Sequence, residues 1–318
     1  MGTKGQRVKV TNKHLARLLL TGALFGFCLL PIQGRESGAP STHKRNGLID
    51  AIYVSYLPMH GVMTKNMWEN LRKAVQQFED QDPKDQRVQM LALIIEGEIA
   101  RRNKQFDLAR GEFQKADNLS PNDSLPFLGL AETALDQGQT DEASIMLLAA
   151  ESQVSKSVPT GFQHSCYTRV GELYERAGKY SEAVKAYELA VAKKPNWGQG
   201  QRTLAQIYLI LNEPDKALDH AQKAVALEPK EPSGYSILGE AQSLLGRKNL
   251  ALDALRKAVE LDPGNPLFHY ELGLEYESQG NKILALRSYL TAKNLTEHGN
   301  YPTDLVQDLD KGIARVQK

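Results

Sequence analysis

The sequence is poor in the residue types from which disulfide frameworks, metal sites and catalytic centres are built. Its 318 residues include two cysteines, too few for a disulfide framework or a cysteine-based zinc site. The seven histidines are scattered, and no spacing places two of them on one turn of a helix. Glycine-rich phosphate loops, Gly-x-Ser-x-Gly elbows and His-Glu-x-x-His helices do not occur in the sequence. We therefore expect no enzymatic activity, no metal ion and no cofactor.

The main part of the chain also lacks an excess of positive charge. The formal net charge is +1, but residues 1–45 hold eight basic groups and one acid. This leaves 31 basic and 37 acidic residues in 46–318. A nucleic-acid partner needs a basic surface for its phosphates, so we expect none. Aromatic residues make up 7% of the chain, which disfavours a surface of stacked aromatic rings for a polysaccharide.

One apolar segment is long enough to bear on the cellular location of the protein. Residues 18–34 are 17 uncharged residues, at the lower end of the range of about 17–25 that a membrane span needs. A basic segment, 1–17, precedes them, and a polar linker, 35–47, follows. This order is typical of a signal peptide that is cleaved, and equally of a single membrane anchor that is retained. Both alternatives stay open.

Both alternatives place the rest of the chain on the same side of the membrane. The positive charges of residues 1–17 stay in the cytoplasm by the positive-inside rule. With the anchor retained, we expect a protein of the cytoplasmic membrane that faces the periplasm or the exterior. With the signal cleaved, after Gly34 or Ala39, we expect a soluble periplasmic protein.

The dominant feature of the sequence is an internal repeat of 34 residues. Its clearest copy, 164–197, combines two amphipathic helical patterns separated by Gly178. Glycine readily adopts the left-handed conformation in which many helices end, and Pro195 prevents the second helix from continuing. The positions that define this copy are Tyr167, Val170, Gly171, Tyr174, Ala183, Tyr187 and Ala190.

Six copies of the repeat can be aligned over residues 90–299. Their frames are 90–123, 124–157, 164–197, 198–231, 232–265 and 266–299. The eighth position of each frame holds a small residue: Gly97, Ala131, Gly171, Ala205, Gly239 and Gly273. The twentieth holds alanine: Ala109, Ala143, Ala183, Ala217, Ala251 and Ala285. So does the twenty-seventh: Ala116, Ala150, Ala190, Ala224, Ala258 and Ala292.

Each repeated position has a physical reason. A small residue lets two helix backbones approach closely, and alanines seven residues apart lie on one face of the second helix. Large residues at the twenty-fourth position, such as Phe113 and Tyr289, are expected to fill the gap between repeats. The turn inside each pair holds glycine or Asn212, with Lys104 as the exception. Proline follows the second helix in four of the six frames.

These residues and their spacing resemble the tetratricopeptide repeat family over about two thirds of the chain. The resemblance implies an all-α fold: an α-solenoid of stacked antiparallel helix pairs that forms a right-handed superhelix with capping helices. It also implies that the first helix of each pair lines a concave groove in which a protein partner binds. A fold of this kind does not identify the partner.

Residues outside the six frames are expected to cover the ends of the stack, because an exposed end would leave apolar surface in water. Residues 48–89 are expected to form an N-terminal cap or a degenerate repeat, with a helix over 67–78. Residues 300–318 are expected to form a C-terminal capping helix. A six-residue insertion, 158–163, is expected either to bend the superhelix or to project from one face.

The ninth position of each frame stands next to the small residue and is expected to face the groove. Glutamates there would form an acidic track for a partner segment that bears lysine or arginine. The alternative is that glutamate is a good helix former on a solvated face. Nearby arginines would interrupt the track in its middle. The candidates are Glu98, Glu132, Glu172, Gln206 and Glu240, with Arg169, Arg176 and Arg202.

Apolar residues on the first helix of the sixth repeat form a second candidate surface. Leu267, Tyr270 and Leu274 recur at helical spacing, while other residues of that helix already supply the core. Some of the three should therefore face the groove. An exposed apolar strip of this kind is typical of a protein-binding site.

The sequence favours a non-enzymatic adaptor or scaffold, exported or tethered to the membrane, that binds a protein or peptide segment in its groove. Envelope assembly, secretion and pilus biogenesis are typical settings for exported relatives. Two alternatives stay open. One is a scaffold that assembles with itself, and the other is an accessory subunit that holds a polysaccharide or another substrate chain for an enzyme.

Overall fold

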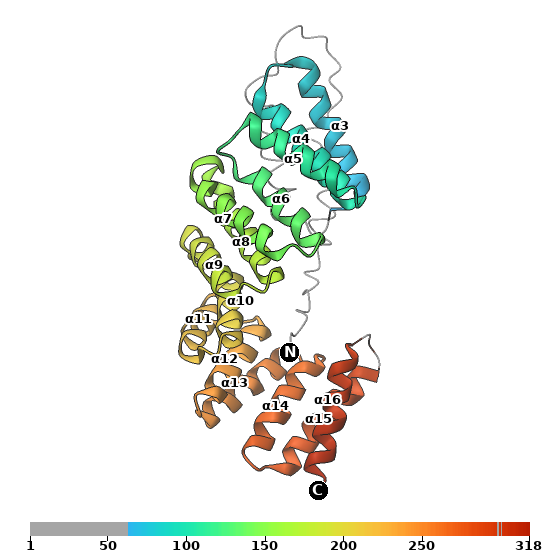
Figure 1. Ribbon diagram of the computed structural model, residues 1–318. Coiled ribbons are helices and arrows are strands. Elements are labelled where there is room, and N and C mark those ends of the chain that lie inside the picture. Colours follow the sequence, from blue (N-terminus) through green and yellow to red (C-terminus); the bar gives the residue numbers. More distant parts are fainter. Residues whose placement is uncertain (1–62, 298, 300) are drawn as a thin grey trace, which may run out of the picture. The chain divides into compact units, whose positions relative to one another are not determined.

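The computed structural model describes residues 63–297, 299 and 301–318, and Figure 1 shows it as a ribbon. This part of the chain contains fourteen helices and no strand. The chain divides after Ala177 into two compact units. We call them the N-terminal unit, with helices α3 to α8, and the C-terminal unit, with helices α9 to α16. Each unit is described by itself.

Short turns join the helices of both units. The N-terminal unit consists of α3 (Lys65–Gln81), α4 (Gln86–Arg102), α5 (Phe106–Leu119), α6 (Ser124–Asp136), α7 (Thr140–Ser157) and α8 (Thr160–Arg176). The C-terminal unit consists of α9 (Tyr180–Lys193), α10 (Gly198–Ile210), α11 (Pro214–Leu227), α12 (Pro232–Leu244), α13 (Lys248–Leu261), α14 (Pro266–Ser278), α15 (Lys282–Glu297) and α16 (Thr303–Val316).

Consecutive helices form pairs, and the pairs stack on one another within each unit. The helices α4 and α5, α6 and α7, α10 and α11, α12 and α13, and α14 and α15 pack together as pairs. The second helix of a pair also contacts the first helix of the next pair, as α5 contacts α6 and α13 contacts α14. This arrangement confirms the predicted all-α fold of stacked helix pairs.

A large side chain of the second helix lies against a glycine of the first helix in several pairs. A β-carbon added to Gly97 would lie 2.8 Å from the ring of Phe113, and one added to Gly273 would lie 2.6 Å from the ring of Tyr289. Carbon atoms in contact normally lie about 3.5–4.0 Å apart. Glycine therefore leaves the space that the ring occupies, and the eighth and twenty-fourth positions are two halves of one contact within a repeat.

The same rings also reach the next repeat. The ring of Phe113 lies against Gly129 of α6 as well as Gly97 of α4, and the ring of Tyr289 lies against Gly312 of α16. The expectation that these side chains fill the gap between repeats was therefore incomplete. Each ring fixes the spacing inside its own pair and the spacing to the following first helix at once.

The alanines at the twentieth and twenty-seventh positions are buried in both units. All twelve have exposed fractions of at most 1%. A larger side chain at any of them would have to displace a neighbouring helix, because protein interiors are close-packed. This burial agrees with the role that the 34-residue spacing predicts for these positions.

The turn inside each helix pair places one residue in the left-handed backbone region. The φ angle is +77° at Gly138 and +71° at Gly246. Lys104 and Asn212 adopt the same conformation, with φ of 63° and 58°. Lys104 is thus an exception in residue type but not in backbone conformation. A residue with a β-carbon is strained there, and asparagine tolerates the strain better than lysine.

The insertion at 158–163 does not project from a face, which corrects one of the two expectations for it. Helix α8 begins at Thr160, so most of the inserted residues lengthen the first helix of this repeat. It has 17 residues, whereas α6 has 13. Val158 is buried, and the Gln163 side chain donates a 3.0 Å hydrogen bond to its carbonyl oxygen.

Helix α3 covers one end of the N-terminal unit. Its buried residues Trp68, Leu71 and Val75 lie on the side that packs against α4. Ahead of this helix, Met63 is buried, and its carbonyl oxygen accepts a 3.0 Å hydrogen bond from the Arg102 side chain of α4. The helix predicted over 67–78 is therefore present, and it begins before and ends after the predicted range.

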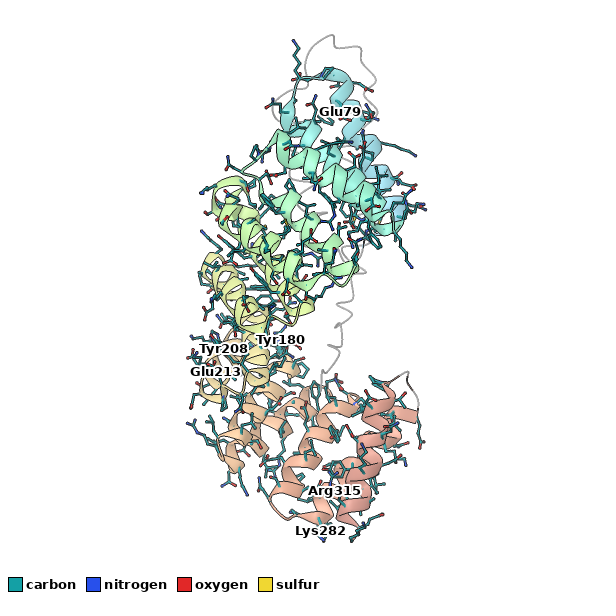
Figure 2. All side chains as sticks on the ribbon, in the orientation of Figure 1. Glu79, Tyr180, Tyr208, Glu213, Lys282 and Arg315 are labelled. Atoms are coloured by element: carbon teal, nitrogen blue, oxygen red, sulfur yellow. The ribbon has the colours of Figure 1, made fainter. Side chains whose placement is uncertain are left out.

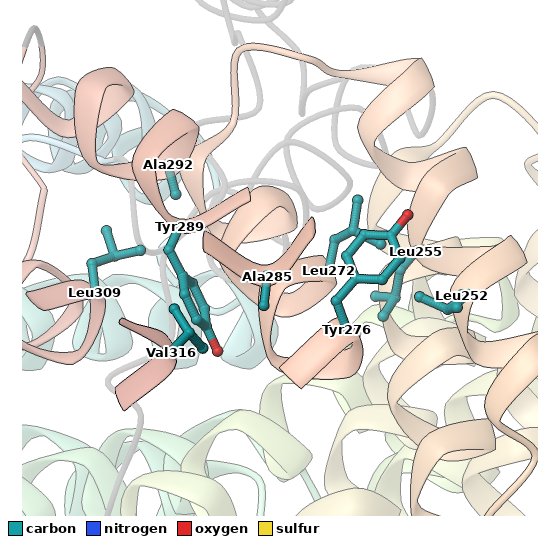
Figure 3. Close-up of a cluster of buried hydrophobic side chains, with 9 residues drawn as sticks. All are labelled: Leu252, Leu255, Leu272, Tyr276, Ala285, Tyr289, Ala292, Leu309 and Val316. Carbon is teal, nitrogen blue, oxygen red and sulfur yellow. The ribbon is translucent and has the colours of Figure 1, made fainter. Parts of the chain in front are cut away.

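Helix α16 covers the end of the C-terminal unit, as predicted. Its residues Leu309 and Val316 are buried beside Tyr289, in the cluster that Figure 3 shows. Arg315, labelled in Figure 2, donates hydrogen bonds of 2.7 and 2.9 Å to the two carboxylate oxygens of Glu277 on α14. The Tyr289 hydroxyl donates to the same carboxylate over 2.5 Å. The cap is thus held by apolar contacts and by a bidentate ion pair.

Several sequence predictions lie outside the described residues. They concern the basic segment 1–17, the apolar segment 18–34, the linker 35–47 and the first part of 48–89. Among the helices that the structure describes, none has both the length and the apolar character that a membrane span requires.

Replacing Lys104 by glycine should stabilise the protein by about 1 kcal/mol, because glycine enters the left-handed region without steric cost. Gly138→Ala is the matched opposite change. An added β-carbon there meets no atom within 4 Å, so an expected loss of about 1 kcal/mol comes from the backbone alone. Urea unfolding followed by circular dichroism measures both free energies. A Lys104→Gly variant that is no more stable than the parent chain would mean that the Lys104 backbone is not strained at this turn.

Candidate functional site

The first helices of the pairs carry every residue that the sequence predicts for partner binding. They are α4, α6 and α8 in the N-terminal unit, and α10, α12 and α14, followed by the cap α16, in the C-terminal unit. Successive first helices of each unit contact one another. We call their exposed surface the first-helix face of the unit. The predicted residues are Glu98 on α4; Glu132 on α6; Arg169, Glu172 and Arg176 on α8; Arg202 and Gln206 on α10; Glu240 on α12; and Leu267, Tyr270 and Leu274 on α14.

The first two glutamates of the predicted acidic track are buried and paired with arginines. Glu98 and Glu132 have exposed fractions of 0% and 1%. The Nη2 atom of Arg101 lies 2.8 Å from Glu98 Oε1 and 2.9 Å from Glu132 Oε2. Arg102 forms a further ion pair with Glu98. The expectation of free carboxylates is therefore wrong for these two residues.

The ion pairs continue from α6 to α8. Arg169 pairs with Glu132, and its Nη1 lies 3.0 Å from Glu172 Oε2. Asp136 pairs with Arg101 on one side, and on the other its Oδ1 lies 2.8 Å from Nη2 of Arg176. Together these contacts form an ion-pair network in which four carboxylates match four guanidinium groups across three first helices. Its members are Glu98, Arg101, Arg102, Glu132, Asp136, Arg169, Glu172 and Arg176.

Arg101 is the centre of this network. Its exposed fraction is 9%, and burial alone would lower the pKa of its guanidinium. The charges and hydrogen bonds of Glu98 and Asp136 outweigh that effect and raise the pKa. The arginine therefore stays charged, and its charge is neutralised by carboxylates of the same protein. The network joins α4, α6 and α8, and it leaves little uncompensated charge on the N-terminal first-helix face.

The predicted arginine of α10 is also paired. Arg202 forms an ion pair with Glu228, which lies at the end of α11. The two residues line an open pocket of about 520 Å³ at the start of α10, whose other lining residues are Trp197, Gln199, Pro229, Lys230 and Glu231. The lining holds two cationic and two anionic side chains, so the pocket has no net charge. Gln206, one turn further along α10, is exposed.

The carboxylates of α12 and α14 differ from those of the N-terminal unit. The Ser236 hydroxyl donates a 2.6 Å hydrogen bond to Glu271, and the Ser243 hydroxyl donates a 2.5 Å hydrogen bond to Glu275. Among the described residues, no lysine or arginine forms an ion pair with Glu240, Glu271 or Glu275. The Gln279 side-chain amide also donates a 2.8 Å hydrogen bond to Glu275. These donors are neutral, so no cation in the described part of the chain balances the charge of the three carboxylates.

Two of these carboxyls have raised pKa values, and burial is the main cause of both shifts. Burial raises the pKa of Glu271 to about 7; the hydrogen bond from Ser236 opposes this rise, and the negative charge of Glu240 adds to it. Burial also raises the pKa of Glu240, although part of that side chain is in contact with solvent.

Apolar side chains stand beside these carboxylates. Leu244 on α12 and Leu274 on α14 have exposed fractions of 54% and 37%, and Ile210 on α10 is also exposed. Leu267 and Tyr270 are only half exposed, and the Tyr270 ring lies 6.0 Å from the Tyr289 ring of the core. Of the predicted apolar strip, Leu274 is therefore the residue that faces solvent most fully, and Leu244 is a neighbour that the sequence analysis missed.

Sequence analysis missed the residues that decide the charge of both faces. Arg101, Arg102 and Asp136 neutralise the N-terminal carboxylates, and Glu271 adds to the charge of the C-terminal ones. The sequence held one sign of this pairing: positively charged residues stand three and four positions after Glu98, which is the spacing of ion pairs on a helix. In the described part of the chain, no group of three or more potential ligands could hold a metal ion. Cys166 is buried, which raises the pKa of its thiol to about 12.

Comparison with protein families finds the same repeat. The model described as a tetratricopeptide repeat-like domain matches residues 50–210, which is 161 of the 318 residues. A second model, described as a tetratricopeptide repeat, matches residues 202–266. The two matches together run through five of the six frames that the 34-residue spacing defines.

Individual proteins show weaker likeness. The BBSome complex member BBS4 homolog of Drosophila melanogaster is 29% identical over 119 residues, 36% of this chain, and the chain spans only 24% of that relative's length. The structure of MamA from Desulfovibrio magneticus RS-1 is 19% identical with a TM-score of 0.47, covering 56% of this chain and 97% of that one. YrrB, described as a TPR protein with an unusual peptide-binding site, is 22% identical with a TM-score of 0.46, covering 63% and 97%.

Replacing Arg101 by glutamine should destabilise the protein by about 3–5 kcal/mol, because it leaves Glu98 and Glu132 buried without the cation they share. Arg176→Gln removes the same charge from the exposed edge of the network and should cost less than about 1 kcal/mol. Unfolding in urea, followed by circular dichroism, compares the two variants. Equal and small losses would mean that the buried network does not hold the first helices together.

Proposed function

This chain belongs to the tetratricopeptide repeat-like family, and on that premise we propose that it is a non-enzymatic adaptor or scaffold whose first helices bind a protein partner. Domains of this family are typically protein-binding modules without catalytic activity. The fold supports this role, since stacked helix pairs present the side chains of successive first helices on one continuous surface of each unit.

One observation carries the proposal. The C-terminal first-helix face combines exposed leucines with carboxylates that no described cation balances. A partner that covers the exposed leucines and brings a cation to the partly desolvated carboxylates would stabilise both. In the N-terminal unit, by contrast, the ion-pair network supplies a cation to each of its carboxylates. We therefore place the main partner-binding surface on α10, α12 and α14.

We further propose that the protein acts beyond the cytoplasm, tethered to the membrane or released into the periplasm. The basic segment 1–17 and the uncharged segment 18–34 support this location. Envelope assembly, secretion and pilus biogenesis are settings that fit an exported adaptor. Membership of a protein complex is named for the Drosophila relative, and a role as one component among several fits a scaffold of this kind.

Self-assembly is the second candidate function, and exposed apolar residues of the second helices favour it. Ile145 and Leu148 stand one turn apart on α7 and are both largely exposed, and Ile283 on α15 is exposed to 82%. Such residues could contact another copy of the chain. A role in holding a polysaccharide has less support, because the large exposed hydrophobic residues among those described are leucine and isoleucine, without aromatic rings.

Photo-cross-linking in the cells that make the protein tests the adaptor role. A photoreactive residue at Gln206 or Leu274 should cross-link a distinct partner protein, whereas the same residue at Ile283, on a second helix, should not. Denaturing gels and mass spectrometry identify the products. Cross-links at Ile283 alone, or products that contain two copies of this chain, would favour self-assembly and contradict the adaptor role of the first helices.

A further inference from the structure

The two units place different residues at one and the same register of neighbouring first helices. In the N-terminal unit, Glu132 at the ninth position of its frame forms an ion pair with Arg169 at the sixth position of the next frame. In the C-terminal unit, Glu240 stands at the ninth position, and the sixth position of the next frame holds Glu271. A glutamate thus replaces the arginine that completes the pair elsewhere in the chain.

The structure brings these two glutamates within electrostatic reach of each other. The negative charge of Glu240 acts on Glu271, and burial acts on both carboxyls. Within the described part of the chain, the hydrogen-bond donor to Glu271 is the Ser236 hydroxyl, over 2.6 Å. Two neighbouring carboxylates that are partly desolvated repel each other, and a cation between them would replace this repulsion by attraction. The site therefore lacks the positive charge that Arg169 supplies to the N-terminal unit.

The apolar surroundings indicate what kind of cation fits. Leu244 lies four residues after Glu240 on the same side of α12, and Leu274 lies three residues after Glu271 on α14. Both leucines are exposed beside the carboxylates. A small inorganic cation would leave these leucines in water. A lysine or arginine side chain on a peptide would satisfy the carboxylates, and apolar residues of the same peptide would cover the leucines.

We propose that the C-terminal first-helix face binds a peptide segment that carries lysine or arginine next to leucine-like residues, with the cationic group placed between Glu240 and Glu271. The proposal rests on the adaptor function proposed above and specifies the chemistry of its partner. The partner's cation takes the place at this register that Arg169 takes in the N-terminal unit.

The probe is a fluorescein-labelled synthetic peptide of lysine and leucine, and its control is the matched peptide of glutamate and leucine. Fluorescence polarisation with the full chain measures the dissociation constant of each. The lysine peptide should bind and the glutamate peptide should not. Equal binding of the two peptides, or no binding of the lysine peptide, would overturn the proposal.

The variant Glu271→Arg separates a specific site from general attraction to an acidic protein. It restores within the chain the arrangement of Glu132 and Arg169, so it should weaken binding of the lysine peptide by about tenfold or more while the protein stays folded. Glu182→Arg makes the same change of charge at an exposed position of the second helix α9 and should change the dissociation constant by less than about twofold. Equal losses in the two variants would overturn the proposal, as would unchanged binding by Glu271→Arg.

The outcomes distinguish this inference from the adaptor function on which it rests. If photo-cross-links from Leu274 to a partner persist in Glu271→Arg, the adaptor role stands and the basic chemistry of the partner is wrong. Sedimentation velocity of the parent chain and of Glu271→Arg tests another occupant. Self-association that Glu271→Arg abolishes would assign the face to a second copy of the chain and overturn the peptide assignment.

Discussion

A large side chain on a second helix lies against a glycine of its own first helix and a glycine of the helix that follows, and the arrangement of the pairs depends on this contact. The ring of Phe113 touches the backbone at Gly97 and at Gly129, and the ring of Tyr289 does the same at Gly273 and Gly312. Because one ring sets both distances, the spacing within a pair and the spacing to the next pair cannot vary independently. Successive first helices therefore meet in a defined register, which decides which side chains of neighbouring repeats face each other.

Once this register is set, single residues determine whether the carboxylates of a first-helix face are neutralised by cations of the same chain. In the N-terminal unit, arginines of the same helix and of the neighbouring first helices pair with the buried carboxylates and neutralise the charge that the sequence predicts for a partner. In the C-terminal unit, serines and a further glutamate occupy the corresponding surroundings. One repeat architecture thus provides a unit whose first helices are joined by ion pairs and a unit whose first-helix carboxylates have no cation among the described residues.

The fold could be predicted from the sequence because the contacts that define it recur every 34 residues. Burial of Ala190 or Ala258 follows from that spacing alone. The charged site could not be predicted in the same way, because its partners lie on different repeats. The inserted residues 158–163 place Glu132 and Arg169 37 positions apart, whereas Glu240 and Glu271 are 31 positions apart, so equal registers do not stand out as equal spacings. Aligning the frames shows that the two pairs of positions are equivalent. Whether the residue at each position is buried or paired can be seen only in the packed helices.

In the free chain, no cation of the described residues balances the carboxylates of α12 and α14. The most direct measurement is a nuclear magnetic resonance titration of the Glu271 carboxyl in the full chain, with isotope-labelled glutamate and with Glu271→Gln to assign the signal. We expect a pKa of about 7 for this carboxyl, because burial and the charge of Glu240 both disfavour the ionised form. A pKa at or below the ordinary 4.5 would contradict this expectation, because it would mean that a positive charge already compensates the site.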